Sequence, residues 1–492
     1  MRWWVLGVLG ASAFTTAASA QRTVNVSNVA ELMAAYGDAA PGDEIVLGSG
    51  RYMLTHRLNT TVDGTEAMPI TVRGDGATVV FSDATGIVEG FFVSHPYWRF
   101  EDLRVEGSCG NDSRCEHAWH IVGAADFTIV RGNVARNFNA HIKANRSEVG
   151  GESLFPDDVL VEGNEFFSEA VRMTANPVTP IDVVGGRRWI LRANYIHDFA
   201  KGMGNNISYA AFLKGNSRDG VIERNLVSCE RLHTGQIRLG LSFGGGGSNP
   251  DPICEDRDCS VEHQGGVMRN NVIANCPADV GVFINECADC AILHNTIYNS
   301  TGIDVRFVPT SNIRVEGNIL AGRIRDRDGA TSMRANNLEM VTDWNAWFAD
   351  PANLDFSLED GSAFVNMGAA SSDVPDDYCG NLRDDRMPDL GAVEYDGDGP
   401  CDTTTTHTGV MMPPVPDAGV DAGGIDAGAV DAGDETDAGS GTRDTGTAGD
   451  GGRSDAGERS GGGGCAVASF SSFSSFSWVA LFVLLRRRRA LL

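Results

Sequence analysis

A short pattern recurs through the middle of the chain: an apolar strand, a polar turn, an asparagine and a second strand. The clearest copy is GVIERNLVSC, which carries Asn225. Seven copies follow one another in steps of 31, 30, 31, 46, 24 and 23 residues, and their asparagines are Asn133, Asn164, Asn194, Asn225, Asn271, Asn295 and Asn318. A unit of about 20–30 residues cannot bury its apolar face alone, so successive units must stack. The pattern therefore predicts a solenoid.

The strands of each unit are short, β-branched and alternating, and no helical period separates them. Three such strands per turn with an asparagine at a fixed bend are typical of a parallel β-helix, because asparagine tolerates left-handed backbone and can bond to the asparagine one turn away. We predict an all-β fold with Asn164, Asn194 and Asn225 in register at one bend. In these motifs, residues 24–395 resemble the right-handed parallel β-helix superfamily, which includes pectate, alginate and chondroitin lyases.

Both ends of the predicted coil carry closing segments. Ser27 can cap a short helix, NVAELMAAY, before the first turn. After the last repeat, DDYCGNLRDDRMPDLGAVEYD resembles the closing segment of secreted β-helix proteins, and we interpret Arg383 and Asp389 as a structural salt-bridged cap. Residues 21–400 are predicted to form one domain, because a solenoid adds core linearly with its length.

The first 20 residues are typical of a cleaved secretory signal. Arg2 precedes an apolar run, and small residues ending at Ala20 precede Gln21, which becomes the first residue after cleavage. A membrane anchor is the alternative, although the apolar run is short for a bilayer span.

Residues 401–464 are rich in Asp, Ala and Gly and contain the triplet DAG six times. They have almost no large apolar residues, so we predict a disordered linker. Twelve acidic residues and three arginines between Asp402 and Gly464 contribute −9 to the net charge of −27. The acidity of the rest of the chain argues against nucleic acid as a partner.

Residues 465–492 begin at Cys465, continue with an apolar, serine-rich run and end after four arginines. The run is long enough for a transmembrane helix whose basic end stays in the cytoplasm. The arrangement resembles the MYXO-CTERM type of sorting tail, which implies that Cys465 is the processing residue and that the helix anchors the protein before processing. We expect a monomer that is displayed at the cell surface, associated with the outer membrane, or released.

Apart from Cys465 the chain has ten cysteines, an even number for a protein that meets an oxidising compartment. Cys229 and Cys276 follow Asn225 and Asn271 by four and five residues, so they can meet across adjacent turns. The local candidates for the remaining bonds are Cys109 with Cys115, Cys254 with Cys259, Cys287 with Cys290, and Cys379 with Cys401. A zinc site at Cys287 and Cys290 is the rival interpretation.

The chemistry is expected on the strand that precedes the turn before each asparagine strand. Side chains alternate along a strand; the aligned strands put Ile121, Ile142, Ile181, Leu213, Ile237, Ile284 and Val305 inward. The outward set is then His120, His141, Lys143, Asp182, Lys214, Arg238, Asn285, Asp304 and Arg306. The resemblance to lyases implies that this face holds an acidic polysaccharide, whereas a solvated sheet face is the alternative.

Lys214 and Arg238 are the predicted catalytic pair. On strands one turn apart, their charged groups are expected within roughly 10 Å. Elimination from a uronic acid requires a cation at the carboxylate and a base at C5, and nearby cations lower the pKa of a lysine. Lys214 would be the base and Arg238 the carboxylate partner or proton donor. Alginate and chondroitin lyases have a similar Lys and Arg order, but NNISYAAF before Lys214 lacks the acidic calcium ligands of that family.

The insertion SFGGGGSNPDPICEDRDCSVEHQ lengthens one repeat to 46 residues, and long insertions are often functional. Its carboxylates predict a calcium site with Asp256, Asp258 and Glu262 as ligands. A disulfide-pinned acidic loop without a metal is the alternative.

Two functions of different class fit the sequence. The first is a polysaccharide lyase that cleaves an acidic polymer by β-elimination. The second is a non-catalytic surface protein that binds glycans or mediates adhesion. Both share the broader prediction of an exported β-helix that acts on or binds an acidic polysaccharide.

Overall fold

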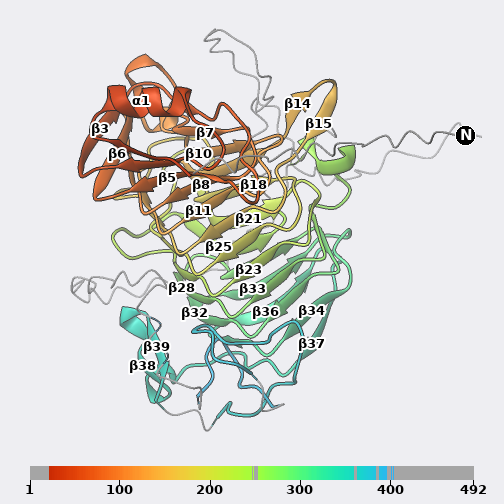
Figure 1. Cartoon of the computed structure of the whole chain (residues 1–492). Helices are drawn as coiled ribbons and strands as arrows, with labels where there is room; N and C mark the ends of the chain where they lie inside the picture. The colour runs from red at the N-terminus through yellow and green to blue at the C-terminus, as the bar shows by residue number, and fades with distance from the viewer. Residues whose placement is uncertain are drawn as a thin grey trace, which may run out of the picture.

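Three parallel β-sheets wind around one axis in a computed structural model of the chain (Figure 1). The structure describes residues 21–245, 248, 253–359, 363–383, 387–395, 401 and 403. Each turn of the coil contributes one strand to each sheet, and every strand pair within the three sheets is parallel. The chain is a right-handed parallel β-helix, as the repeats predict.

The strands of the three sheets, called A, B and C, follow in chain order. Sheet A contains β1 (Thr23–Val26), β2 (Glu44–Leu47), β5 (Ile70–Gly74), β8 (Trp98–Glu101), β11 (Ile129–Arg131), β16 (Leu160–Glu162), β19 (Ile190–Arg192), β23 (Val221–Glu223), β27 (Val267–Arg269), β31 (Ala291–Leu293), β34 (Ile313–Glu316) and β37 (Ser332–Ala335). Sheet B contains β3 (Gly50–Leu54), β6 (Ala77–Ser82), β9 (Arg104–Ser108), β12 (Val134–Arg136), β17 (Glu165–Phe167), β20 (Tyr195–His197), β24 (Leu226–Ser228), β28 (Val272–Cys276), β32 (Thr296–Ser300) and β35 (Ile319–Leu320). Sheet C contains β4 (Leu58–Asn59), β7 (Phe91–Val93), β10 (His117–Val122), β13 (Ala140–Asn145), β18 (Ile181–Val184), β21 (Ile207–Lys214), β25 (Ile237–Phe243), β29 (Val282–Asn285), β33 (Gly302–Arg306) and β36 (Arg323–Arg327).

Shorter strands decorate the coil. β14 (Ser147–Val149) and β15 (Glu152–Leu154) form an antiparallel hairpin, and β22 (Ser217–Arg218), β26 (His263–Gln264) and β30 (Cys287–Ala288) form a small parallel sheet. The inward side chains of the three large sheets form one continuous core that runs from Val26 to Ala330. Each added turn extends this core, so the fold needs no second layer.

The predicted asparagine ladder is present, and it is buried. The backbone N–H and side-chain Nδ2 of Asn164 both donate to Oδ1 of Asn194, at 3.1 and 2.9 Å, and Asn194 donates in the same way to Asn225. The seven asparagines are at most 1 % exposed, and Asn337 adds an eighth rung that the repeat pattern missed. Left-handed backbone falls on the residue before each asparagine, such as Gly163 (φ 63°) and Ala193 (φ 52°), and not on the asparagine itself. The asparagine is therefore needed for its hydrogen bonds and not for its φ.

The helix α1 (Val29–Gly37) covers the first turn, at the red end of Figure 1. Its buried residues Leu32 and Tyr36 belong to the main core. Ser27 is not the N-cap: Asn28 accepts from the backbone N–H of Glu31, while the Glu31 carboxylate accepts from Ser27. The N-cap therefore lies one residue later than predicted. Serine and asparagine are both common N-cap residues, so residue type alone does not distinguish Ser27 from Asn28.

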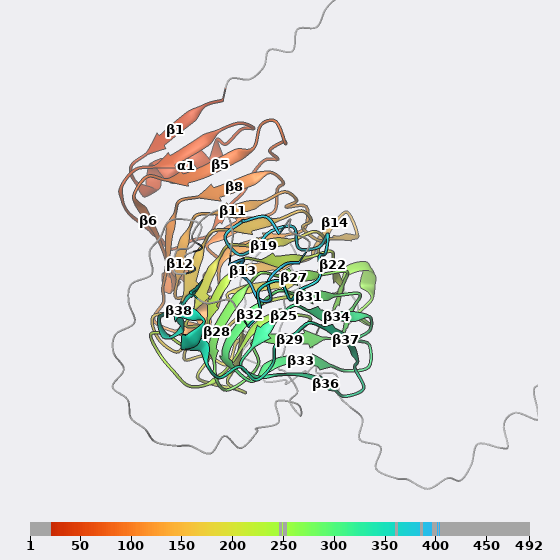
Figure 2. The same ribbon diagram turned by 90° about the horizontal axis from the view of Figure 1, so that it is seen from below.

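The C-terminal segment lies along the side of the coil. It contains β38 (Phe348–Asp350) and β39 (Asp355–Leu358), and its aromatic residues pack on outward residues of sheet B such as Tyr195 and Leu226. Figure 2 places β38 beside β28, away from β33 and β36 of sheet C. The outer face of sheet B is thus occupied on its later turns, from β20 to β35.

The predicted cap around Arg383 is confirmed as a structural cluster with different partners. The guanidinium pairs with the Glu394 carboxylate and donates to the carbonyl oxygens of Asp389 and Gly391. The Asp389 carboxylate instead accepts from the backbone N–H groups of Asn366 and Tyr395. The ion pair predicted between Arg383 and the Asp389 carboxylate is therefore replaced by one with Glu394.

All five predicted disulfides are present. Cys229–Cys276 joins adjacent turns, and the other bonds are Cys109–Cys115, Cys254–Cys259, Cys287–Cys290 and Cys379–Cys401. The zinc interpretation of Cys287 and Cys290 is wrong, since these sulfurs bond to each other.

The predicted signal peptide with Ala20, most of the linker, and the tail with Cys465 lie outside the described residues. Within the described part, no helix has the length and apolar character needed to cross a membrane.

The ladder predicts a large effect of one buried amide. Asn194→Ala removes the side-chain bonds to Val161 and Asn225 and leaves the N–H of Asn164 without an acceptor, while Nδ2 of Asn164 keeps only its bond to the Val130 carbonyl. We expect the free energy of unfolding, measured by denaturant titration, to fall by roughly 2–4 kcal/mol. Asn25→Ala, at an exposed strand position, should change it by less than about 0.5 kcal/mol. Equal effects would contradict the role of the ladder.

The long disulfide predicts a second difference in stability. Cys229–Cys276 spans 47 residues and Cys109–Cys115 spans 6. Loop closure predicts a loss of roughly 4 kcal/mol for Cys229→Ala with Cys276→Ala, and roughly 2 kcal/mol for Cys109→Ala with Cys115→Ala. Unfolding midpoints of the two double variants check the order, and the reverse order would count against the entropic account.

Candidate functional site

The outer face of sheet C carries polar and aromatic residues at matching register positions. On one line, Phe92, His120, Lys143, Asp182 and Phe212 occupy successive strands. Farther along the coil the same line continues through Ser242, Phe283 and Asp304. A second line, two positions along the strands, contains Lys214, and Asn285 pairs there with Arg306.

Three of the predicted substrate-binding residues meet on consecutive turns. His120 pairs with Lys143, and Lys143 pairs with Asp182. The Lys143 ammonium lies 3.2 Å from the Asp182 carboxylate, and each residue is 3 % exposed. Removing one partner of a buried ion pair leaves an uncompensated charge, so the loss of either side chain alone is expected to destabilise the fold.

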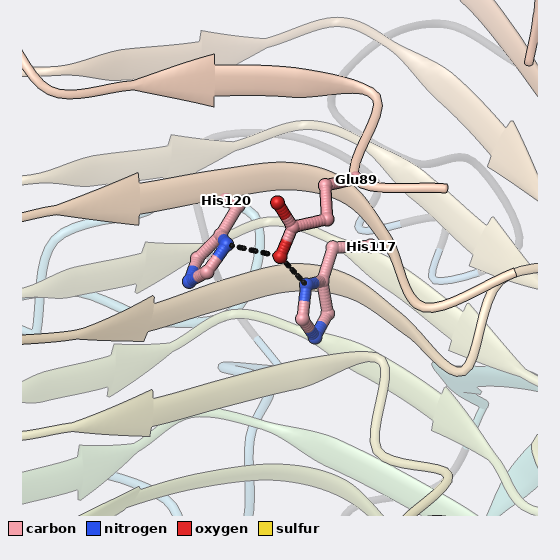
Figure 3. A group of neighbouring side chains, drawn as sticks. All are labelled: Glu89, His117 and His120. Carbon is pink, nitrogen blue, oxygen red and sulfur yellow. Dashed lines mark hydrogen bonds and ion pairs between the residues drawn. The ribbon is translucent and has the colours of Figure 1, made fainter. Parts of the chain in front are cut away.

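A cluster beside these residues was missed from the sequence (Figure 3). The Glu89 carboxylate oxygen lies 3.2 Å from Nδ1 of His120 and 4.0 Å from Nδ1 of His117. We call Glu89, His117 and His120 the histidine cluster. It is the one group of three such side chains, within the described residues, that could hold a metal ion.

The local fold brings these three side chains together. Gly90 precedes β7, and a Cβ at this position would lie 2.2 Å from the Ala118 carbonyl oxygen, so only glycine permits the close approach. The adjacent Glu89 then lies beside the start of β10. Strict alternation would place His117 and His120 on opposite faces. His117 is the first residue of its strand, so alternation does not fix its side chain, and the HAWH spacing gave no signal.

Electrostatics hold Glu89 in its ionised form. Burial alone would raise its pKa, but the His120 hydrogen bond, the charges of His120 and His117, and the Arg57 hydrogen bond together bring the pKa well below its usual range. Arg57 lies 2.8 Å from the second carboxylate oxygen and is 46 % exposed. The cluster therefore presents a cation to solvent through Arg57.

The later turns of sheet C carry an arginine-rich group. Asp304 contacts Arg325 at 2.6 Å and Arg327 at 2.9 Å, while Arg306 pairs with Asp328 at 2.5 Å. The predicted residues Asp304 and Arg306 thus belong to one region, but each is neutralised by a partner. Asp279 was not predicted as a site residue. Burial is the main cause that raises its pKa to about 6, and the charges of Asp304, Arg325 and Arg306 also act on it.

The predicted pairing of Lys214 with Arg238 is wrong. Arg238 is in register with Ser208, six residues before Lys214 on β21. Six strand residues span roughly 20 Å. A register slip of six residues keeps every side chain on its face, so alternation cannot detect it. Ile237, aligned with Leu213 in the sequence, accordingly lies outside the main core.

Neither member of that pair projects into solvent. Arg238 is 1 % exposed and donates to the carbonyl oxygens of Cys229 and Gly235, so it holds the turn before β25. Lys214 is 3 % exposed, its ammonium lies 4.6 Å from the centre of the Phe212 ring, and Gly245 lies against both side chains. The catalytic roles of Lys214 and Arg238 stay predictions, but the close approach of the two side chains that motivated them is absent.

His141 also has a structural environment. Its Nε2 donates to the Phe167 carbonyl, and its ring stacks on Phe166. Burial lowers its pKa to about 3, so it is neutral near pH 7. His141 points to the core edge and away from the line of His120 and Lys143, which corrects its assignment to the outward set.

The predicted calcium ligands do not converge. Asp256 pairs with Arg187 and Arg218, and Asp258 accepts from the Ser260 backbone. Glu262 is 2 % exposed and accepts from Ser248 and from the Gly215 backbone. These carboxylates fix the insertion against the coil and do not fit a calcium site.

Comparisons with known proteins find similarity in structure only. No protein-family model and no curated protein matches the chain. Among solved structures, pectate lyase Pel9A has a TM-score of 0.49 at 14% identity, over 74% of this chain and 90% of that one. A rhamnogalacturonan lyase has a TM-score of 0.45 at 12% identity, over 72% and 92%. An alginate lyase from Paenibacillus sp. str. FPU-7 has a TM-score of 0.41 at 17% identity, over 65% and 96%. At these identities the likeness concerns the fold alone.

Asp279 predicts a pH-dependent stability. Its carboxyl binds a proton more tightly in the folded chain than in the unfolded one, so the contribution of Asp279 to stability should increase as the pH falls from 7 to 4. Asp304 opposes its ionisation, whereas Arg325 and Arg306 favour it. We expect Asp279→Asn to stabilise the protein by roughly 2–3 kcal/mol more at pH 8 than at pH 4. Denaturant titrations at both pH values check this, and an equal effect at both would contradict it.

Proposed function

We propose that this protein binds an acidic polysaccharide along the outer face of sheet C, at the turns that carry Phe92, His120 and Lys143. The observation that carries the proposal is a stack of a cation on an aromatic ring that occurs three times at sheet C, whereas one such stack, Arg231 on Tyr195, lies at sheet B. Arg57 lies 4.2 Å from the Phe92 ring centre, Lys214 4.6 Å from that of Phe212, and Arg306 4.7 Å from that of Phe307.

The chemistry of these stacks matches a charged sugar chain. An aromatic ring offers an apolar surface to the C–H face of a sugar, and the stacked cation offers a partner for a carboxylate. The net charge of the chain is −27, so an anionic polymer can approach only where cations are exposed. Sheet A also carries outward arginines, such as Arg131 and Arg192, but each of these lies between two glutamates of the same sheet. On sheet B, the later turns that carry Tyr195 and Leu226 are covered by the C-terminal segment.

The accessible end of the face is at Arg57. Its side chain is 46 % exposed and Phe92 is half-buried, whereas Lys214 lies beneath the start of the insertion. We therefore assign first contact with the polymer to Arg57 and Phe92, with His120 and Lys143 on the next turns. Export and surface display, as the two ends of the sequence predict, would bring this face to polysaccharide outside the cell.

Elimination is the second candidate, and the position of Lys143 favours it. Lys143 lies one turn from His120 and two turns from Phe92, so a uronate at Arg57 is closer to Lys143 than to the covered Lys214. Cleavage would require a base to take the C5 proton while the C4–O bond breaks. Adhesion without cleavage needs only the binding face.

Binding is tested with polygalacturonate and alginate, and with dextran as the neutral control. Arg57→Ala should weaken binding of the acidic polymer about tenfold, since it removes the exposed cation of the stack. Arg51→Ala is the matched control, because Arg51 is also exposed and pairs with a glutamate, Glu106, but lies on sheet B. Titration calorimetry should give an unchanged affinity for the control. Equal losses, or equal binding of dextran, would refute the assignment.

Cleavage is tested by the ultraviolet absorbance of the unsaturated product. If elimination occurs, Lys143→Met with Asp182→Asn, which removes both charges of this ion pair, should abolish it, and Lys214→Ala should retain it. Loss of activity only in Lys214→Ala would restore the sequence-based assignment.

A further inference from the structure

We propose that Glu89, His117 and His120 form a binding site for a divalent transition metal of the zinc class. This inference goes beyond polysaccharide binding and does not depend on it. The three side chains each offer one ligand atom, and these atoms all lie within 4.8 Å of one another.

The donor set selects the class of metal. Two imidazole nitrogens and one carboxylate are ligands that zinc and its first-row neighbours accept, whereas calcium prefers oxygen ligands. An ion at about 2.0–2.2 Å from each atom spans ligand pairs up to about 4.4 Å apart. The separations of Glu89 Oε1 from His120 Nδ1 and His117 Nδ1, 3.2 and 4.0 Å, fall within that limit, and the ligand atoms of the two histidines lie within 4.8 Å of each other. In Figure 3 both rings turn one nitrogen toward the same carboxylate oxygen.

The surroundings orient His120 as a ligand. Its Nε2 lies 3.0 Å from Oδ1 of Asn145 on the next strand, so Nε2 donates and Nδ1 is the atom left to face Glu89. A hydrogen bond from the second ring nitrogen is the usual support of a metal-bound histidine. The edge of the ring also packs against Phe92, with the ring centres 5.4 Å apart.

The site is rigid on one side and open on the other. The two histidines lie on β10, are 7 and 4 % exposed, and follow the Cys109–Cys115 disulfide directly. The Glu89 side chain is 24 % exposed, and its second oxygen is held by Arg57. Three protein ligands with solvent on the fourth side are typical of a site that keeps an exchangeable position. The rival state is an ion pair of Glu89 with a protonated His120 and no metal.

The test uses the full chain without a histidine tag, stripped with a chelator and titrated with zinc sulfate by calorimetry. We expect one equivalent to bind, with a melting temperature that increases as the site fills. Glu89→Gln and His117→Ala should each weaken zinc binding at least tenfold. His56→Ala, which removes an exposed histidine outside the cluster, should leave it unchanged.

Asn145 serves as the positioning residue in the same titration. Asn145→Ala should weaken zinc binding about tenfold, and Asn145→Asp, which keeps an acceptor, should restore it. The proposal is overturned if the folded wild type binds no more zinc than His117→Ala, or if calcium competes at equal concentration. Since no polysaccharide is present, failure here leaves the binding proposal untouched.

Discussion

The asparagine ladder is the interaction on which the rest of the structure depends. On each rung the backbone N–H and the side-chain Nδ2 of one asparagine donate to the Oδ1 of the next, as Asn164 does to Asn194. These groups are buried, so water cannot replace a lost hydrogen bond. From Asn133 to Asn337 the ladder fixes the bend between sheets A and B. On these turns, residues of sheet C that are far apart in sequence, such as Lys143 and Asp182, come to lie side by side.

The sequence predicts the fold well because the ladder repeats. Asn133 to Asn318 mark one position per turn, and they also located the Cys229–Cys276 disulfide between adjacent turns. Sheet C has no such marker. Lys214 and Arg238 were therefore aligned by alternation alone, and a slip of six residues preserves alternation. The histidine cluster was missed for a related reason, since Glu89 lies before its strand and His117 begins one, where periodicity carries no information.

The outer faces of sheets B and C have different surroundings. On its later turns, sheet B is buried by aromatic residues of the C-terminal segment. The outer face of sheet C carries ionised and aromatic residues that are not part of the main core, including the Lys143–Asp182 ion pair. Buried charges destabilise unless they are paired, and an apolar pair would serve packing as well. These buried charges, beside the exposed Arg57, are the physical basis for placing function on sheet C.

A crystal structure of the protein with an acidic oligosaccharide tests this placement most directly. The account predicts density for the sugar on sheet C, with a ring against Phe92 and a carboxylate at Arg57. Density for the sugar on sheet A or on the C-terminal segment, with Arg57 still paired only to Glu89, would contradict it.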